Sequence, residues 1–407
     1  MASIKHLMNR EFKHLSGGLF EEVNKADVGE GAGNLIAQGV DIMAWADPFF
    51  PDPSIPESVK KVMIEAITDG FPSHYSMPIG MKELRVEIAS KIERETALSI
   101  NPSRNVIVTP GSDSGLLYAM MPFIETGDEI MVVDPSYPSN YLDPVLLKGS
   151  VIHVPLDEKN NYALNIDEFE KRLTSKTKMV VITHPNNPTT TVFRKDNLIQ
   201  LCNFIKKNDL ILVCDQAFED HIFDGIEFIS PCTLPGMWER TVTVCSISKG
   251  LGLSGFRIGY IYAPDEIMDI YYAAAVNVLG AASTITSIGA LQALREREYL
   301  RSLTKRHEQR RTLAYSIFSK VRGISLEKSE SGILTWINVS KLGTSSDIVA
   351  YLLKEANVLV NDGSSYGELG KGHIRVVTSV FGDDEKAKEV FHRIATALEK
   401  KYLSNNM

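Results

Sequence analysis

Residues 241–250 read TVTVCSISKG, an apolar and mostly β-branched run that ends in polar residues and Lys249. Such a run predicts a buried strand, whose last residues would lie at the carboxyl edge of a sheet. A lysine at that edge is partly desolvated, which disfavours the ammonium form and leaves a nucleophilic amine. Most lysines are solvated surface charges, but this position favours an amine that forms a Schiff base with an aldehyde.

Similar apolar runs alternate with helical patterns from about residue 105 to 263 and predict one wide, mostly parallel sheet. The candidates for its seven strands are residues 105–109, 129–133, 151–154, 178–183, 210–214, 241–245 and 257–262. A long amphipathic helical stretch, residues 285–321, then leads to a tail of mixed strands and helices. We therefore predict an α/β fold, with a large domain at residues 49–281 and a smaller α+β domain made of residues 1–48 and 282–407.

The composition and net charge argue against several classes of binding partner. The 407 residues include 43 Lys and Arg and 51 Asp and Glu, a net charge of −8, and no basic block stands out. Nucleic acid and anionic membrane surfaces are therefore not expected partners. The four cysteines lack the spacing of metal ligands, so we expect reduced core thiols and no metal. No run approaches the length of a membrane span, and the N-terminus lacks an apolar leader, so the cytoplasm is the expected compartment.

The segment after the first predicted strand could bind a phosphate. Residues 109–115 read TPGSDSG and open a helical pattern, so Gly111 and Ser112 would lie at a helix N-terminus with free N–H groups. A plain helix cap is an equally good interpretation. Asp113 is unfavourable beside a phosphate dianion unless its side chain turns away.

Other strand ends carry residues that suit a pyridine ring. Tyr137 could stack on a planar heteroaromatic ring, although a core or turn tyrosine is as common. Asn187 could donate to a phenolic oxygen, although Asn-Pro is also ordinary turn chemistry. Asp215 ends an apolar run, and a buried carboxylate there needs a partner such as a protonated pyridine nitrogen. Together with Lys249, these residues fit one phosphorylated pyridine aldehyde.

In their order and spacing these motifs resemble the class I/II aminotransferases, a family of pyridoxal phosphate-dependent enzymes of fold type I. The resemblance extends from residues 75–85, similar to the family's Tyr-x4-Gly-x3-Leu-Arg segment, to residues 373–375. It implies pyridoxal 5′-phosphate as cofactor, an L-amino acid and a 2-oxo acid as substrates, and a homodimer. The cofactor contacts that it implies are Gly111, Ser112, Asp113, Tyr137, Asn187, Asp215, Ser246, Ser248, Lys249, Arg257 and, from the neighbouring subunit, Tyr75.

The resemblance also assigns catalytic and substrate-binding roles. Lys249 would be the Schiff-base lysine and the base that moves a proton between Cα and C4′. Asp215 would keep the ring nitrogen protonated, and Tyr137 would stack on the ring. Arg375 would bind the substrate α-carboxylate. Asn187 and Ala46 would complete the list of substrate contacts.

The sequence departs from the family pattern at three positions. Phe218 replaces a tyrosine, Thr190 replaces a glycine, and Ala46 replaces a glycine near the N-terminus. Residues 265–294 contain no arginine for a distal substrate carboxylate, which favours a neutral or apolar amino donor.

Two other interpretations compete with transamination. The alternative within this fold is a β-eliminating C–S lyase or another enzyme that works through an α-carbanion. A nicotinamide-binding interpretation of residues 250–255, which match G-x-G-x-x-G, fails because a strand rather than a helix is predicted to follow.

Overall fold

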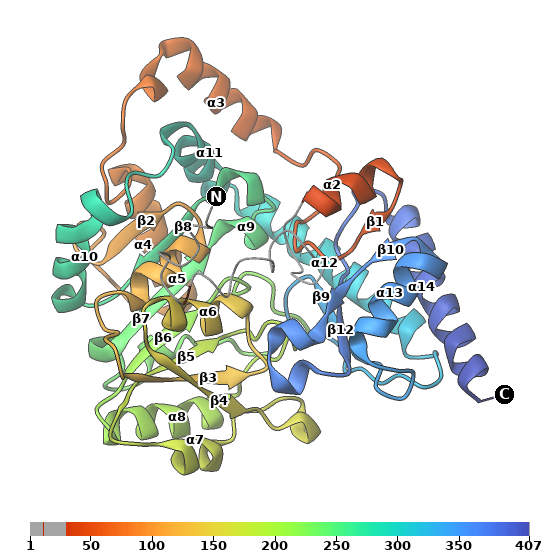
Figure 1. Cartoon of the computed structure of the whole chain (residues 1–407). Helices are drawn as coiled ribbons and strands as arrows, with labels where there is room; N and C mark the ends of the chain where they lie inside the picture. The colour runs from red at the N-terminus through yellow and green to blue at the C-terminus, as the bar shows by residue number, and fades with distance from the viewer. Residues whose placement is uncertain (1–10, 12–29, 407) are drawn as a thin grey trace, which may run out of the picture.

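The structure, a computed structural model, describes Glu11 and residues 30–406. Figure 1 shows a large part built on a wide sheet beside a smaller part built on a short sheet. Of the predicted N-terminal segment 1–48, residues 1–10 and 12–29 lie outside the described residues. The predicted division of the chain after residues 48 and 281 stays a prediction.

The wide sheet has seven strands in the order β2-β8-β7-β6-β5-β3-β4, which confirms the predicted mostly parallel α/β fold. Only β8 runs antiparallel to its neighbours, β2 and β7. The strands are β2 (Val106–Thr109), β3 (Glu129–Asp134), β4 (Ser150–Pro155), β5 (Thr177–Thr183), β6 (Ile211–Asp215), β7 (Thr241–Ser246) and β8 (Gly259–Tyr262).

The central strands β5, β6 and β7 are buried over most of their length because helices cover both faces of the sheet. In β5, Met179 and Val181 pack in one apolar cluster, while Val180 and Ile182 pack in another on the opposite face. This alternation follows from the two-residue period of a strand. Helices of the first cluster are α5 (Ser112–Met120) and α10 (Asp265–Val278), and those of the second are α7 (Ile166–Arg172) and α8 (Lys195–Lys207). The short α6 (Pro138–Leu146) follows β3.

The last strand of the sheet is shorter than predicted. It begins at Gly259, whereas we expected it to begin at Arg257. Arg257 instead ends the 3-10 helix η6 (Ser254–Phe256), with a left-handed φ of 53°. The left-handed turn at Arg257 therefore lies before the strand and not within it.

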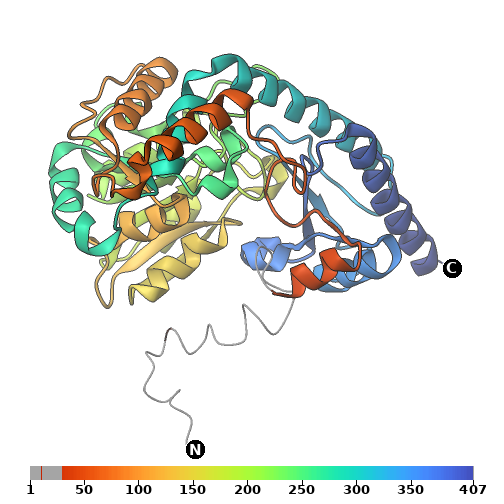
Figure 2. The same ribbon diagram turned by 90° about the horizontal axis from the view of Figure 1, so that it is seen from above.

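The predicted helical stretch 285–321 is two helices, α11 (Thr284–Arg295) and α12 (Arg297–Phe318). The chain breaks at Glu296, where ψ is 71°. α11 packs with α3 (Glu57–Asp69) and α4 (Lys82–Thr96) of the large part. α12 contacts α14 (Asp384–Asn405) and β9 (Leu334–Asn338) of the small part, and Figure 2 shows α12 passing from one part to the other. The two helices thus bury their apolar faces against different neighbours.

The small part has an antiparallel sheet in the order β11-β12-β9 and a separate parallel pair, β1 with β10. Its core is formed with α12, α13 and α14. The remaining elements are α2 (Glu30–Ala37), β1 (Asp41–Ile42), β9 (Leu334–Asn338), α13 (Ser345–Ala356), β10 (Val358–Leu359), β11 (Asn361–Asp362), β12 (His373–Val377) and α14 (Asp384–Asn405).

All four cysteines are buried and unpaired, which confirms that they are core thiols. Within the described ranges, no helix has both the length and the apolar character needed to cross a bilayer.

Candidate functional site

A cavity of about 470 Å³ opens where the carboxyl ends of several sheet strands meet residues of the small part. Parallel sheets commonly place ligands at this edge. Eleven of the thirteen predicted site residues line the cavity: Ala46, Ser112, Asp113, Tyr137, Asn187, Asp215, Ser246, Ser248, Lys249, Arg257 and Arg375. The other two, Gly111 and Tyr75, do not line it.

Lys249 lies on α9 (Ile247–Gly250), a single helical turn directly after β7. Ser246 caps this turn, because its side chain accepts a hydrogen bond from the Ser248 N–H at 3.1 Å. The Lys249 amine donates to the backbone oxygen of Ala46, on the opposite wall of the cavity. The amine therefore reaches across the cavity from a turn with a defined start.

Asp215 is a buried carboxylate at the end of β6, only 3% exposed. It accepts hydrogen bonds from the Ala217 N–H at 3.1 Å and from the Thr183 hydroxyl at 3.2 Å. Burial nevertheless raises the pKa of Asp215 to about 7. Among the described residues, no cationic side chain forms an ion pair with it. A positively charged ring nitrogen in the cavity would supply the missing partner.

Ser112 and Arg257 line one corner of the cavity, and Gly111 packs against Arg257 there. Gly111 has a φ of +87°, a backbone conformation that favours glycine, and the Arg257 guanidinium occupies the space beside it, 2.3 Å from where a Cβ would lie. α5 begins at Ser112. The hydroxyls of Ser246 and Ser254 also line this cavity. Hydroxyls, a guanidinium and a helix start are suitable ligands for a phosphate.

Asp113 does not contribute an unpaired negative charge at this corner. Its carboxylate accepts a hydrogen bond from the Tyr137 hydroxyl at 2.9 Å. It also lies 3.5 Å from the Arg257 guanidinium. The carboxylate thus links the ring of Tyr137 to the arginine and orients both.

Arg375 comes from β12 of the small part and is 1% exposed. Its guanidinium donates to the Asn361 side chain at 2.6 Å, to the Ala44 backbone oxygen at 2.9 Å and to the Asn187 side-chain oxygen at 3.1 Å. It also lies over the Tyr366 ring, 4.9 Å from the ring centre. Because the Asn187 oxygen accepts from Arg375, the Asn187 NH₂ group is left to donate to a ligand.

The family model for aminotransferases of class I and II matches residues 42–394. The chain belongs to this aminotransferase family. The aminotransferase is 29% identical to the aromatic-amino-acid aminotransferase 2 of Thermococcus litoralis, over 90% of this chain and 95% of the relative. It is 30% identical to the aspartate aminotransferase of Pyrococcus abyssi, over 87% of this chain and 91% of the relative. Its fold matches the aromatic aminotransferase of Pyrococcus horikoshii with a TM-score of 0.84 at 28% identity, over 91% and 99% of the two chains.

Membership of the family confirms the predicted activity class. The protein is an enzyme that transfers an amino group between an amino acid and a 2-oxo acid. The structural relatives also confirm the predicted fold type.

Two departures from the family pattern have structural consequences. Thr190 has a φ of 67°, a left-handed conformation that suits glycine and that β-branched residues rarely adopt. Phe218 lines the cavity but has no hydroxyl to direct into it. Its ring packs closely against Gly332, where a Cβ would lie 2.9 Å from the Phe218 ring.

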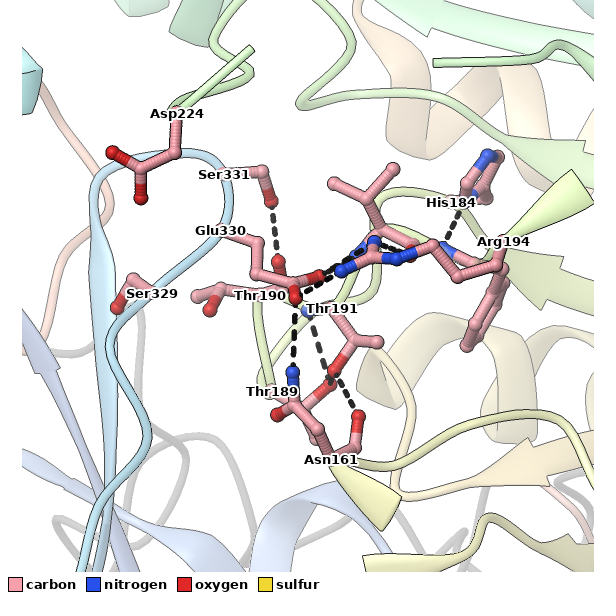
Figure 3. Close-up of polar contacts among 12 residues, drawn as sticks. Asn161, His184, Thr189, Thr190, Thr191, Arg194, Asp224, Ser329, Glu330 and Ser331 are labelled. Atoms are coloured by element: carbon pink, nitrogen blue, oxygen red, sulfur yellow. Dashed lines mark hydrogen bonds and ion pairs between the residues drawn. The ribbon is translucent and has the colours of Figure 1, made fainter. Parts of the chain in front are cut away.

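A group of hydrogen bonds, which we call the clasp, joins the small part to the large part beside Thr190 (Figure 3). We define the clasp as Glu330 and Ser331 with Asn161, Thr190, Val192 and Arg194. Glu330 accepts from the Val192 N–H at 2.8 Å, from the Asn161 amide at 3.1 Å and from the Arg194 guanidinium at 3.1 Å. The Ser331 hydroxyl donates to the Thr190 backbone oxygen at 2.8 Å. The clasp therefore fixes the loop that follows Asn187.

Sequence reasoning missed part of the cavity wall. Trp45, Asp47, Leu116, Ala217 and Ser254 also line the cavity. Ser254 carries a weak signal, because it lies three residues before Arg257, one of the cofactor contacts that the family resemblance implies. Trp45 and Leu116 carry no local signal, since only the meeting of distant segments brings them to the cavity.

Proposed function

We propose that this aminotransferase binds pyridoxal 5′-phosphate in the cavity, covalently through Lys249. The observation that carries the proposal is the unpaired, buried carboxylate of Asp215 in the same cavity as the lysine amine. Ser112, Ser246, Ser254 and Arg257 would hold the phosphate. Tyr137 would lie against the ring, and the Asn187 NH₂ group would donate to its phenolic oxygen.

The bound cofactor supplies a ring that withdraws electrons from the substrate Cα. Asp215 makes this possible by keeping the ring nitrogen protonated, and each pKa unit of this effect corresponds to about 1.36 kcal/mol. Once the substrate amine has replaced Lys249 on the cofactor, the freed Lys249 amine would take the proton from Cα and return it at C4′. Arg375 holds the substrate α-carboxylate and so directs the Cα–H bond toward Lys249. The Ala46 backbone forms the opposite wall.

The amino donor that suits this cavity is neutral or apolar. The cations that line it are Lys249, Arg257 and Arg375, and each already has one of the roles above. The side chains of Trp45, Leu116 and Phe218 add apolar surface. A second substrate carboxylate would therefore lack a partner in the described part of one subunit, and burying it unpaired is unfavourable.

We further propose that the enzyme is a homodimer in which Tyr75 reaches the phosphate of the partner's site. Tyr75 is 99% exposed in the isolated chain and does not line its own cavity. Large apolar side chains are exposed nearby in sequence, among them Ile64, Ile67, Phe71 and Met77. An exposed apolar group of this kind is typical of an interface.

A single half-reaction tests the function. The purified protein is loaded with pyridoxal phosphate and mixed with individual amino acids in the absence of a 2-oxo acid. We expect the visible absorption to fall as one equivalent of 2-oxo acid forms per site, with the largest effect for neutral or aromatic donors. Continued release of ammonia and 2-oxo acid at constant absorption would identify a lyase instead.

The dimer is tested separately by sedimentation. Wild type should sediment as a dimer at micromolar concentration, and Ile67→Asp should shift it toward the monomer. A monomeric wild type that keeps full activity on dilution would contradict the shared site.

A further inference from the structure

A buried histidine contacts the backbone of Lys249 from outside the cavity. His221 is fully buried, and its Nε2 atom lies 3.2 Å from the Lys249 backbone oxygen. It belongs to the segment that follows Asp215 and Phe218, but it does not line the cavity. The contact joins this segment to the end of α9, whose last carbonyl groups have few helical partners.

The partners of His221 fix its protonation. A carbonyl oxygen only accepts, so the Nε2 atom facing Lys249 must carry a hydrogen. Burial lowers the pKa of His221, which favours the neutral ring, so its Nδ1 atom is an acceptor. The Thr304 hydroxyl of α12 lies 3.0 Å from Nδ1, nearer than the Leu300 and Asp220 backbone oxygens that it also reaches, at 3.1 and 3.4 Å. We assign its single hydrogen to Nδ1, which has no hydrogen of its own in this tautomer. A continuous path of hydrogen bonds thus runs from α12 through His221 to Lys249.

The surroundings of His221 leave little room for α9 to shift. A Cβ at Gly250 would lie 1.8 Å from the Asp220 carboxylate, so the turn rests directly on that side chain. Asp220 is itself held by the buried Lys91, at 3.0 Å. On the other side, the His307 ring packs edge-on against His221 with 4.5 Å between ring centres.

We propose that His221 is a positioning residue that holds the Lys249 turn in register for proton transfer. This inference rests on the proposed function, because it assumes that Lys249 moves the proton. His221 touches neither the cavity nor Arg375. Replacing His221 should therefore slow the proton transfer and leave substrate binding almost unchanged. A base that is displaced slightly from the substrate proton slows the transfer without weakening the contacts that bind the substrate.

The test compares variants that remove or keep the donor. His221→Leu removes it, while His221→Gln places an amide N–H close to the position of Nε2. In the half-reaction, we expect His221→Leu to lower the limiting rate about 3- to 10-fold, the effect of one lost hydrogen bond. The half-saturating concentration of the amino donor should stay within about twofold of the wild-type value, because the contacts that bind the substrate are unchanged. His221→Gln should recover most of the rate.

Thr304 provides an independent pair of variants on the same path. Thr304→Val removes the hydroxyl that orients His221 and should lower the limiting rate about twofold, while Thr304→Ser should not. Equal rates for His221→Leu and wild type, or equal losses for His221→Leu and His221→Gln, would overturn the inference. A wild type that forms no 2-oxo acid and carries no cofactor on Lys249 would instead refute the proposed function.

Discussion

Replacing Glu330 by alanine should break the clasp and destabilise the protein by about 1.5–5.5 kcal/mol. The side chain of Glu330 is 13% exposed, and Val192, whose N–H it accepts, is fully buried. A buried N–H left without an acceptor costs about 1–3 kcal/mol. The lost bond from Asn161 adds about 0.5–1.5 kcal/mol. The ion pair with Arg194, half exposed to solvent, adds at most about 1 kcal/mol.

The assay is equilibrium urea unfolding, followed by tryptophan fluorescence, with Arg194→Ala as the matched control. Arg194→Ala removes the half-exposed guanidinium, which also donates to the Val192 backbone oxygen, and should change the free energy of unfolding by about 0–1 kcal/mol. Glu330→Gln keeps an acceptor for the Val192 N–H and should fall between the two. A loss below about 0.5 kcal/mol for Glu330→Ala, or equal losses for Glu330→Ala and Arg194→Ala, would refute the reasoning.

Three further predictions concern the cavity. In Phe218→Tyr, the added hydroxyl can donate to the phenolic oxygen of the cofactor, so the pH at which the visible spectrum changes should fall, whereas Phe218→Leu should leave it unchanged. In the cofactor-free protein, the folded-state pKa of Asp215, about 7, lies above its unfolded value of 3.8. The protonated carboxyl therefore favours folding, and this contribution to the stability is lost as the pH rises through about 7. In thermal unfolding, the stability lost between pH 5 and pH 8 should be smaller for Asp215→Asn than for wild type. Arg375→Lys loses the planar, two-bond grip on the substrate carboxylate and should lower kcat/KM about 10- to 100-fold in steady-state assays.

The sheet could be predicted from the sequence because strands buried on both faces are rich in apolar and β-branched residues. The runs that become β5, β6 and β7 carry this signal unmistakably. The break at Glu296 could not be predicted, because the amphipathic pattern continues through it while the neighbours of the helix change. The left-handed turn at Arg257 could not be predicted either, because apolar residues flank it on both sides and the strand-like pattern continues through it.

The candidate site could be predicted wherever a functional residue ends a strand or follows the end of a strand within four residues. Asp215, Asn187 and Lys249 satisfy this rule, since the carboxyl ends of adjacent strands meet at one edge. The contacts of His221 and Glu330 could not be predicted, because they join segments more than 25 residues apart through side chains that look ordinary in sequence. The homodimer, the contact of Tyr75 across it and the cytoplasmic location stay predictions.

The most direct measurement is the chemical trapping of the cofactor on the enzyme. The protein is loaded with pyridoxal phosphate, reduced with borohydride and digested, and the modified peptide is identified by mass spectrometry, with Lys249→Ala treated in parallel. We predict one pyridoxyl group per chain, on Lys249, and loss of both the label and amino-group transfer in Lys249→Ala. A label on another lysine, or transfer of the amino group by Lys249→Ala at the wild-type rate, would contradict the central claim.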